Sequence, residues 1–257
     1  METLKTEIER SRAIFVSARH VEENCILHLH PHPEIVLVTD GILEMTVKEK
    51  EYRIPPTYGI FVPPFAPHRF CSSRGNCYHV LEFAGELVPF FFRYIKTHEP
   101  TSHIFAVSPP SLALARATPN SRGEPDYIAA QGVLAPLCHE IAQKCGFISC
   151  DNRKEDICRD AVSYMWSHFT EPLSLATVAH AVGAHPVTLS KVLAARLGIH
   201  FHSYLQYLRC AHALGLIRTE VTPLTDIAYR SGFSSIRSFN RSFLTVYGKP
   251  PSAYRTE

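Results

Sequence analysis

Two arginines and an asparagine near residue 240 could hydrogen-bond to the base edges of a nucleic acid. Arg237, Asn240 and Arg241 occur within five residues, and on a helix they would lie around one side, because residues three and four apart are neighbours there. Phe239 and Phe243 are four apart and share the other side. Guanidinium groups placed on such a helix can pair bidentately with guanine. The spacing therefore predicts a helix with one apolar face for the core and one polar face for DNA.

The residues that come before this helix have the order of a helix-turn-helix motif. Pro223 can open a first helix with Thr222 as its cap. Gly232 can make the turn after it, because glycine accepts a left-handed backbone conformation at little cost. The second helix is then expected to start at Ser234 or Ser235. In this motif the second helix is the one that enters the major groove.

A second copy of the same pattern precedes the first. Ser174 can cap a short helix that Gly183 closes, and Pro186 opens the helix that follows. The candidate DNA contacts on that helix are Thr188, Ser190 and Lys191. Between the copies, Phe201–Arg218 is predicted to be a connecting helix of about 27 Å. It could hold the two recognition helices near the ~34 Å repeat of the major groove.

This pattern resembles the DNA-binding domain of the AraC/XylS family of transcriptional regulators, over about residues 157–257. The matching residues are Leu189-Ser190-Lys191, Leu197-Gly198, Tyr204-Leu205, Leu208-Arg209, Ile227-Ala228, Gly232-Phe233, Phe239, Phe243, Gly248, Pro251 and Tyr254-Arg255. The resemblance implies sequence-specific binding to double-stranded promoter DNA. It also implies an upstream domain that usually senses a small molecule.

The balance of charged residues changes sign near residue 157, where the resemblance to the DNA-binding domain begins. Residues 157–257 contain ten Lys and Arg against five Asp and Glu, whereas residues 1–156 contain sixteen against nineteen. A positive surplus suits contacts with phosphates, and it predicts binding that weakens as the salt concentration rises. With 257 residues and 46% hydrophobic content, the chain can form two modest cores. We expect two domains, residues 1–150 and 151–257, joined by the polar linker Asp151–Glu155.

The sequence gives no sign of export or of a disulfide framework. Met1–Arg12 is charged, and the apolar cluster Leu87–Phe92 is too short to cross a membrane. The eight cysteines form no Cys-x-x-Cys pair, which argues against a zinc cluster and favours free thiols. We therefore expect a bacterial cytoplasmic protein that does not contact a membrane.

The first domain is expected to be β structure up to about residue 84 and helical after it. Short β-prone runs separated by Gly, Pro or Asp turns are typical of a sandwich or barrel. The predicted strands are Ile26–His30, Glu34–Thr39, Leu43–Lys48, Tyr52–Ile54, Gly59–Val62, His68–Phe70 and Tyr78–Phe83. Helices are expected at Gly85–Thr97 and Pro125–Gly146. The fold class is therefore α+β, with a β-barrel and its following helices before an all-α domain that has two helix-turn-helix units.

The predicted barrel contains a second set of side chains that could do chemistry. Strand alternation places His28 and His30 on one face, where both imidazoles can point at one centre. Together with Glu34 and His68 they resemble the two motifs of the cupin fold, over about residues 20–84. The resemblance implies a cupin-like barrel with three histidines and one carboxylate. Such a set suits one divalent transition metal, Zn, Mn, Fe or Ni, but the same residues could line a pocket for an organic effector.

Other polar side chains near this set are harder to place. His32 lies between two prolines in the turn after the strand, and we expect it to be an exposed loop residue rather than a ligand. Tyr78, His79 and Glu82 either line the same cavity or face outward.

Three functions remain open. The first is a ligand-responsive transcriptional regulator without enzymatic activity: the barrel binds an effector, the helices dimerise, and the recognition helices bind promoter DNA, with RNA polymerase as a further partner. We expect its homodimer to form through the apolar stripe Ile128, Leu134, Leu137 and Ile141. The second is a cupin metalloenzyme, such as an oxygenase or isomerase, fused to a DNA-binding domain. The third is a DNA-binding protein with a structural barrel that only dimerises.

Overall fold

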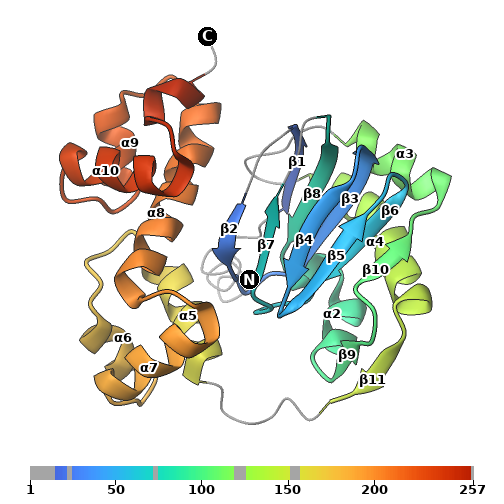
Figure 1. Cartoon of the computed structure of the whole chain (residues 1–257), viewed down its shortest axis with the longest axis horizontal. Helices are drawn as coiled ribbons and strands as arrows, with labels where there is room; N and C mark the ends of the chain where they lie inside the picture. Colours follow the sequence, from blue (N-terminus) through green and yellow to red (C-terminus); the bar gives the residue numbers. More distant parts are fainter. Residues whose placement is uncertain (1–14, 22–24, 72–74, 119–125, 151–156, 256–257) are drawn as a thin grey trace, which may run out of the picture. The chain divides into compact units, whose positions relative to one another are not determined.

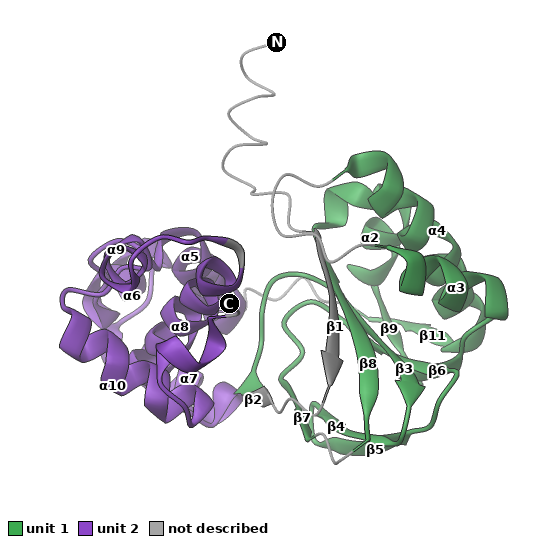
Figure 2. Cartoon of the chain, turned by 90° about the horizontal axis from the view of Figure 1, so that it is seen from above, with its two compact units in different colours: residues 1–155 green, residues 156–257 purple. Residues whose placement is uncertain are grey.

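The computed structural model describes residues 15–21, 25–71, 75–118, 126–150 and 157–255 (Figure 1). The chain forms two compact units, Met1–Glu155 and Asp156–Glu257, here called the N-terminal and C-terminal domains (Figure 2). The linker predicted at Asp151–Glu155 lies outside the described residues. Within the described ranges, no helix has both the length and the apolar character needed to cross a bilayer.

Two antiparallel sheets form the framework of the N-terminal domain (Figure 1). The five-stranded sheet has the order β1 (Phe15–Val21), β8 (Cys77–Phe83), β3 (Glu34–Asp40), β6 (Tyr58–Val62) and β10 (Ile104–Ala106). The four-stranded sheet has the order β2 (Cys25–His28), β7 (His68–Cys71), β4 (Leu43–Val47) and β5 (Lys50–Ile54). A separate small ribbon pairs β9 (His98–Pro100) with β11 (Phe147–Ser149).

Strand β3 shows how the larger sheet is covered on both faces. Val36 and Val38 belong to the core that the two sheets share, whereas Ile35 and Leu37 belong to a second core formed with the helices. Alternate residues of a strand point to opposite faces, so a continuous apolar run marks a strand that is buried on both sides. All five residues from Glu34 to Val38 are buried accordingly.

The helices of this domain follow the five-stranded sheet in the sequence. They are η1 (Gly85–Leu87), α2 (Pro89–Ile95), α3 (Pro109–Ala117) and α4 (Tyr127–Lys144). The predicted helix Gly85–Thr97 is therefore two short helices, because Val88 is not helical and the proline after it has no N–H to continue the ladder. The carboxylate of Asp126 begins α4 by accepting hydrogen bonds from the amides of Ile128 and Ala129. Sequence patterns missed α3, β1 and the three-residue strands β9, β10 and β11.

Helix α4 buries its apolar stripe within its own domain. Leu134, Leu137 and Ile141 are completely buried in the core beneath the five-stranded sheet, whereas Ile128 is 84% exposed. The dimer interface predicted through this stripe is therefore wrong. An apolar helix face shows that the face is covered, but it does not say whether a second chain or the same chain covers it.

This burial predicts a clear difference between two substitutions in α4. We expect Leu134→Ala to lower the free energy of unfolding by about 3 kcal/mol, because it leaves a cavity in a closed core. Ile128→Ala should change it by less than about 0.5 kcal/mol, since the side chain lies in water. Urea unfolding of the two variants measures both values, and equal small effects would contradict the burial of Leu134.

The C-terminal domain consists of two helix-turn-helix motifs and a helix that connects them. Its helices are α5 (Ile157–His168), α6 (Leu175–Ala181), α7 (Pro186–Leu197), α8 (Phe201–Thr219), α9 (Leu224–Arg230), α10 (Ile236–Tyr247) and η2 (Pro251–Tyr254). Figure 1 shows α8 running from the first motif, α6–α7, to the second, α9–α10. The α+β fold class and the paired motifs are confirmed. Helix α5, which no sequence pattern predicted, packs on the first motif.

Most of the predicted helix ends are found in the structure. Ser174 caps α6 by accepting a hydrogen bond from the amide of Thr177, and Ser235 caps α10 in the same way from the amide of Ser238. Gly183 and Gly232 have φ values of +65° and +85°, as the turns of the two motifs require.

One predicted cap is wrong. Helix α9 begins at Leu224, and Pro223 occupies the cap position with an extended backbone. The hydroxyl of Thr222 instead donates a hydrogen bond to Glu220. Proline fixes φ but leaves ψ free, so the sequence alone could not decide whether Pro223 stands just inside or just outside the helix.

Candidate effector site and DNA-binding surfaces

Three imidazoles gather inside the N-terminal domain. His28 ends β2 and pairs with His68 at the start of β7, while His30 lies two residues beyond the end of β2. All three side chains are buried, and their ligand atoms lie within 4.8 Å of one another. The structure thus joins three predicted ligands in a histidine triad that could hold a metal ion. His30 reaches the triad from the loop after β2, so strand alternation is not what places it.

The fourth predicted residue, Glu34, faces two members of the triad. Its Oε2 lies 3.4 Å from Nε2 of His30, and its Oε1 lies 3.7 Å from Nε2 of His68. The Nδ1 atoms of these two histidines lie 2.8 and 2.9 Å from the carbonyl oxygens of His32 and Ala66. Because a carbonyl only accepts, both Nδ1 atoms carry a proton. This fixes the ring orientations and directs both Nε2 atoms toward the carboxylate.

One pair of buried atoms in this arrangement suits a cation. Neither Glu34 Oε1 nor His68 Nε2 has a hydrogen-bond partner among the residues that the structure describes, and both are buried. Two electron-rich atoms that face each other in a low-dielectric interior repel unless a cation lies between them. Imidazole nitrogens and a carboxylate are ligands that Zn, Mn, Fe and Ni accept. The residues present therefore fit the predicted metal.

The charges around the cluster are uneven. Burial by itself lowers the pKa of His30, but the carboxylates of Glu82 and Glu34 outweigh burial and raise this pKa to about 9. Burial, together with the neighbouring His28 and His30, holds the pKa of His68 well below its usual range. Near neutral pH and without a metal, the raised pKa favours the protonated form of His30, and the lowered pKa favours the neutral form of His68.

Two further residues extend the cluster, and the sequence did not assign them to it. Nδ1 of His32 lies 3.0 Å from Oε1 of Glu82, and His30, His32 and Glu82 form a second group whose ligand atoms lie within 4.8 Å of one another. The side chain of His32 is only 17% exposed, so the expectation of an exposed loop residue is wrong. Glu34 pairs directly with Glu82 across β3 and β8, which places both carboxylates on one face of the sheet.

Tyr78 and His79, which the sequence could place either in the cavity or facing outward, lie on different faces of β8. Tyr78 is fully buried in the core between the two sheets, on the same face as Glu82. His79 pairs with Leu37, whose side chain faces the opposite core. Strand alternation therefore turns the imidazole of His79 away from the histidine triad.

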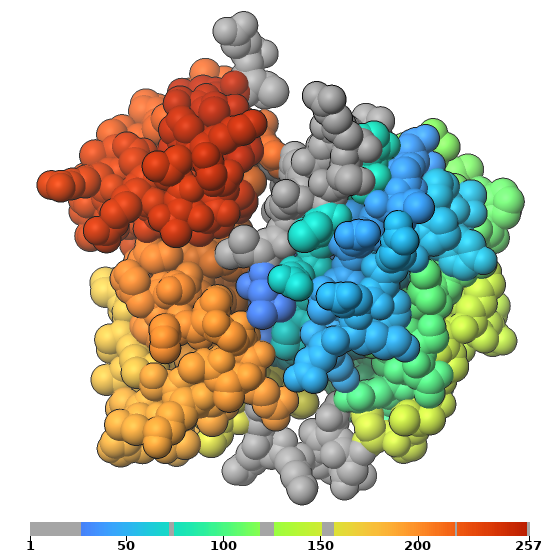
Figure 3. All heavy atoms as spheres, in the orientation of Figure 1, coloured from blue at the N-terminus to red at the C-terminus, as the bar shows by residue number. Residues whose placement is uncertain are grey.

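In the C-terminal domain, the polar face of α10 is open to solvent. Arg237, Asn240 and Arg241 are exposed, whereas Phe239 and Phe243 are completely buried. The red segment of Figure 3, which includes α10, lies at the surface of the domain. The apolar and polar faces predicted for this helix are thus both present, and the polar side chains are free to meet a base edge.

Helix α7 presents a smaller polar face. Thr188 and Lys191 are exposed and Ser190 is half-buried, while Leu189 and Leu193 form the buried stripe. Lys191 is the one candidate in this group with a formal charge. The two recognition helices therefore offer unequal chemistry, with two arginines on α10 and one lysine with two hydroxyls on α7.

Paired recognition helices and a β domain with a buried polar cluster define a DNA-binding regulator with a sensor domain. Two family models match the chain: residues 14–121 match the AraC-like ligand binding domain, and residues 178–257 match a helix-turn-helix domain. The chain belongs to the AraC family of helix-turn-helix transcriptional regulators, with a ligand-binding N-terminal domain. This is a family of regulators and not of enzymes, which decides against the metalloenzyme hypothesis.

Relatives match the whole chain weakly and the C-terminal domain more strongly. YobQ of Bacillus subtilis (strain 168), an uncharacterized HTH-type transcriptional regulator, is 23% identical over 89% of this chain and 88% of its own length. An uncharacterized HTH-type regulator of Staphylococcus aureus (strain COL) is 39% identical over 41% of this chain, which is 14% of that protein. The structure of ToxT from Vibrio cholerae has a TM-score of 0.64 at 16% identity, over 94% of this chain and 97% of ToxT. This likeness shows the shared fold.

Proposed function

We propose that this protein is a sequence-specific transcriptional regulator whose DNA binding responds to a metal ion or a small molecule in the N-terminal domain. The observation that carries the proposal is the pair of exposed polar faces on α7 and α10 within one domain. The proposed sensor and DNA-binding domains are residues 1–150 and 151–257. The protein would act in the bacterial cytoplasm.

The proposed DNA contacts follow from the side chains on the two helices. Arg237 and Arg241, with Asn240 beside them, would read base edges in one segment of the major groove, because an arginine can pair bidentately with guanine. Lys191, with Thr188 and Ser190, would contact the next segment. Helix α8 has 19 residues and is therefore about 28 Å long, close to the ~34 Å that separates successive major-groove segments on one side of DNA.

The proposed effector site is the histidine triad with Glu34. A bound divalent metal would supply a positive centre between the imidazoles and the carboxylate. Since His28, His68 and Glu34 come from β2, β7 and β3, their common ligand would tie the two sheets together. An organic acid is the second candidate, because ToxT has been solved with an unsaturated fatty acid and with a substituted butenoic acid bound.

The proposed regulator also works as a homodimer and contacts RNA polymerase. Its dimer interface must lie outside the buried stripe of α4, because Leu134, Leu137 and Ile141 are covered by their own domain. The effector would act by binding two arrangements of the protein with different affinity, which is the requirement for any coupling between the sensor and the DNA-binding surface.

Selection of DNA fragments from the organism's own genome tests this function. We expect the protein to recover sites with two sequence boxes about one helical turn apart. Binding to them should weaken with rising salt, and it should change at least about fivefold when Zn, Mn, Fe or Ni is added to metal-free protein. Fragments without a common sequence would contradict a sequence-specific regulator. Binding that no metal and no organic acid changes would contradict the effector site.

A further inference from the structure

The turn of the second helix-turn-helix motif lies against the loop that precedes the first motif, beside α8. Arg209 of α8 is 9% exposed. Its Nε donates a hydrogen bond of 2.8 Å to the carbonyl oxygen of Phe169, and its Nη2 donates one of 2.9 Å to that of Glu171. These carbonyls lie in the loop that leads from α5 into the first motif. We call Phe169–Glu171, Arg209 and Ser231–Gly232 the intermotif joint.

The second motif reaches the joint through its turn. Gly232 makes that turn with a φ of +85°, and a Cβ atom there would lie 2.8 Å from the carbonyl oxygen of Phe169 and 2.9 Å from Nε of Arg209. Real Cβ atoms do not approach other atoms so closely. The turn of the second motif therefore packs directly on the loop between α5 and α6 and on the guanidinium group that hydrogen-bonds to this loop.

A second polar contact supports the same arrangement. The hydroxyl of Ser231, which is fully buried, lies 3.1 Å from Nδ1 of His212 on α8. The ring of Phe169 meets the ring of His212 edge to face at 5.3 Å. The loop before the first motif, the connecting helix and the turn of the second motif are thus joined by adjacent contacts.

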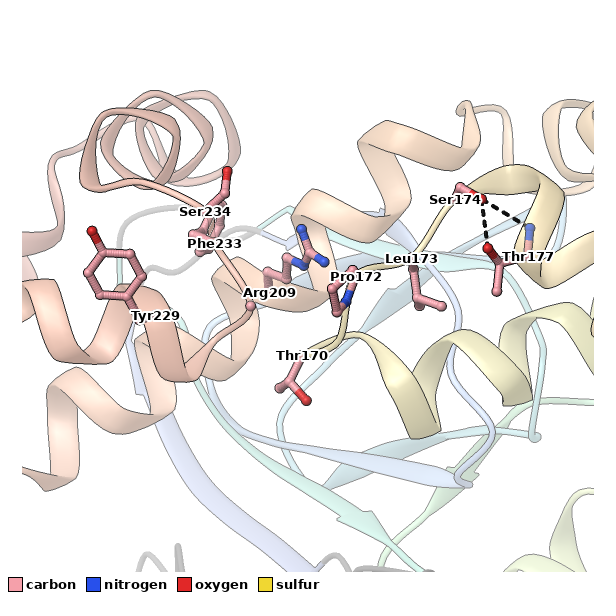
Figure 4. Close-up of a pocket in the computed structure, with 10 residues that line it drawn as sticks. Thr170, Pro172, Leu173, Ser174, Thr177, Arg209, Tyr229, Phe233 and Ser234 are labelled. Atoms are coloured by element: carbon pink, nitrogen blue, oxygen red, sulfur yellow. Dashed lines mark hydrogen bonds between the residues drawn. The ribbon is translucent and has the colours of Figure 1, made fainter.

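Open space lies beside the joint. An open groove of about 480 Å³ lies there, lined by residues from both motifs, and Figure 4 shows the residues that line it. Thr170, Ser174 and Thr177 line it from the first motif and its loop, and Tyr229, Phe233 and Ser234 from the second. Because side chains do not fill this space, the angle between the motifs depends on α8 and on the joint.

We propose that Arg209 and Gly232 are positioning residues that set the distance between the two boxes of the DNA site. This inference rests on the proposed DNA-binding function of α7 and α10. Two binding elements on one rigid body favour a single spacing of their targets, whereas a loose connection tolerates several spacings and lowers the effective concentration of the second element at its target. Hydrogen bonds from one arginine to two carbonyls, and a turn that only glycine allows, make the connection rigid.

The chain contains a matched control for Gly232. Gly183 makes the corresponding turn of the first motif with a φ of +65°, but a Cβ atom there would meet no described atom within 4 Å. Alanine at either position adopts the same unfavourable backbone region. Only Gly232→Ala also pushes against the joint, so the difference between the two variants isolates the joint from the strain of the turn.

The experiment measures DNA affinity for the full chain and its variants Gly232→Ala, Arg209→Ala, Arg209→Lys and Gly183→Ala. Three DNAs are used: the two-box site that the wild type selects, the same site with its spacer changed by one or two base pairs, and a site with one box scrambled.

Gly232→Ala and Arg209→Ala should bind the selected site at least about tenfold more weakly and distinguish the spacers less, while one-box affinity stays within about twofold. Arg209→Lys, which can replace only part of the contact, should be intermediate. Gly183→Ala should keep the spacer preference.

Three results would overturn the inference. The first is an unchanged spacer preference in Gly232→Ala and Arg209→Ala. The second is an equal loss of affinity for one-box and two-box DNA, because the residues would then support folding rather than spacing. Circular dichroism and the melting temperature of the variants identify this case. The third is a wild-type protein that selects no two-box site. This result would contradict the proposed function itself, and the inference would fall with it.

Discussion

Replacing His68 with alanine is expected to remove the metal from the N-terminal domain completely. The wild type should contain about one metal ion per chain after expression in metal-replete medium, and His68→Ala and His28→Ala should contain almost none. The reason is geometric: the ligand atoms of His28, His30 and His68 lie within 4.8 Å of one another, and the ring orientation of His68 is fixed by the carbonyl of Ala66. Elemental analysis of the purified proteins measures the content.

His103 offers a matched control for this experiment. It is also buried in the N-terminal domain, and its Nδ1 also hydrogen-bonds to a carbonyl oxygen, that of Phe61. His103→Ala should keep the metal, although it also removes a buried imidazole ring from this domain. Metal at 100 times its dissociation constant should stabilise the wild type and His103→Ala by about 2.7 kcal/mol each, but not His68→Ala. A folded wild type without metal would leave the organic acid as the better candidate.

The double substitution of Arg237 and Arg241 by alanine is expected to abolish selective binding to the DNA box of the second motif. Each arginine is exposed on the polar face of α10, and each single variant should lose about 1 to 3 kcal/mol of specific binding. The double variant should lose about 2 to 6 kcal/mol if the two contacts are independent. Selection from randomised DNA should show a relaxed preference at a few adjacent base pairs.

A third exposed arginine separates base recognition from general positive charge. Arg230 lies on α9 of the same motif and forms an ion pair with Glu220. Arg230→Ala should leave the selected sequence unchanged, because α9 is not the recognition helix. If Arg237→Ala and Arg241→Ala also left the selected sequence unchanged, α10 would not read bases, and its arginines would contribute only charge.

The sequence predicted most of the C-terminal domain, apart from α5 and the start of α9. Ser174 and Ser235 cap their helices, Gly183 and Gly232 adopt left-handed backbone conformations, and the paired phenylalanines of α10 are buried as predicted. These features depend on residues within about one turn of each other, so local rules of capping and helix periodicity were sufficient. The same rules identified the polar face of α10.

The cluster in the N-terminal domain was determined in part. The types and spacing of His28, His30, Glu34 and His68 indicated a common centre, and the structure brings them together. Glu82 could not be added from the sequence, because it joins Glu34 only through the register between β3 and β8. A shift of that register by one residue would have turned Glu82 to the other face of the sheet.

The tertiary structure alone decided what covers each surface. The apolar stripe of α4 gave the sequence-based prediction of a dimer, yet the five-stranded sheet of the same chain covers it. Likewise, Arg209 matched a family pattern, but its contacts with Phe169 and Glu171 arise only when α8 packs beside the loop after α5. Local sequence thus predicted most helices of the C-terminal domain, most of their ends and the polar face of α10. The partner of each face depends on contacts between distant segments, which periodicity does not encode.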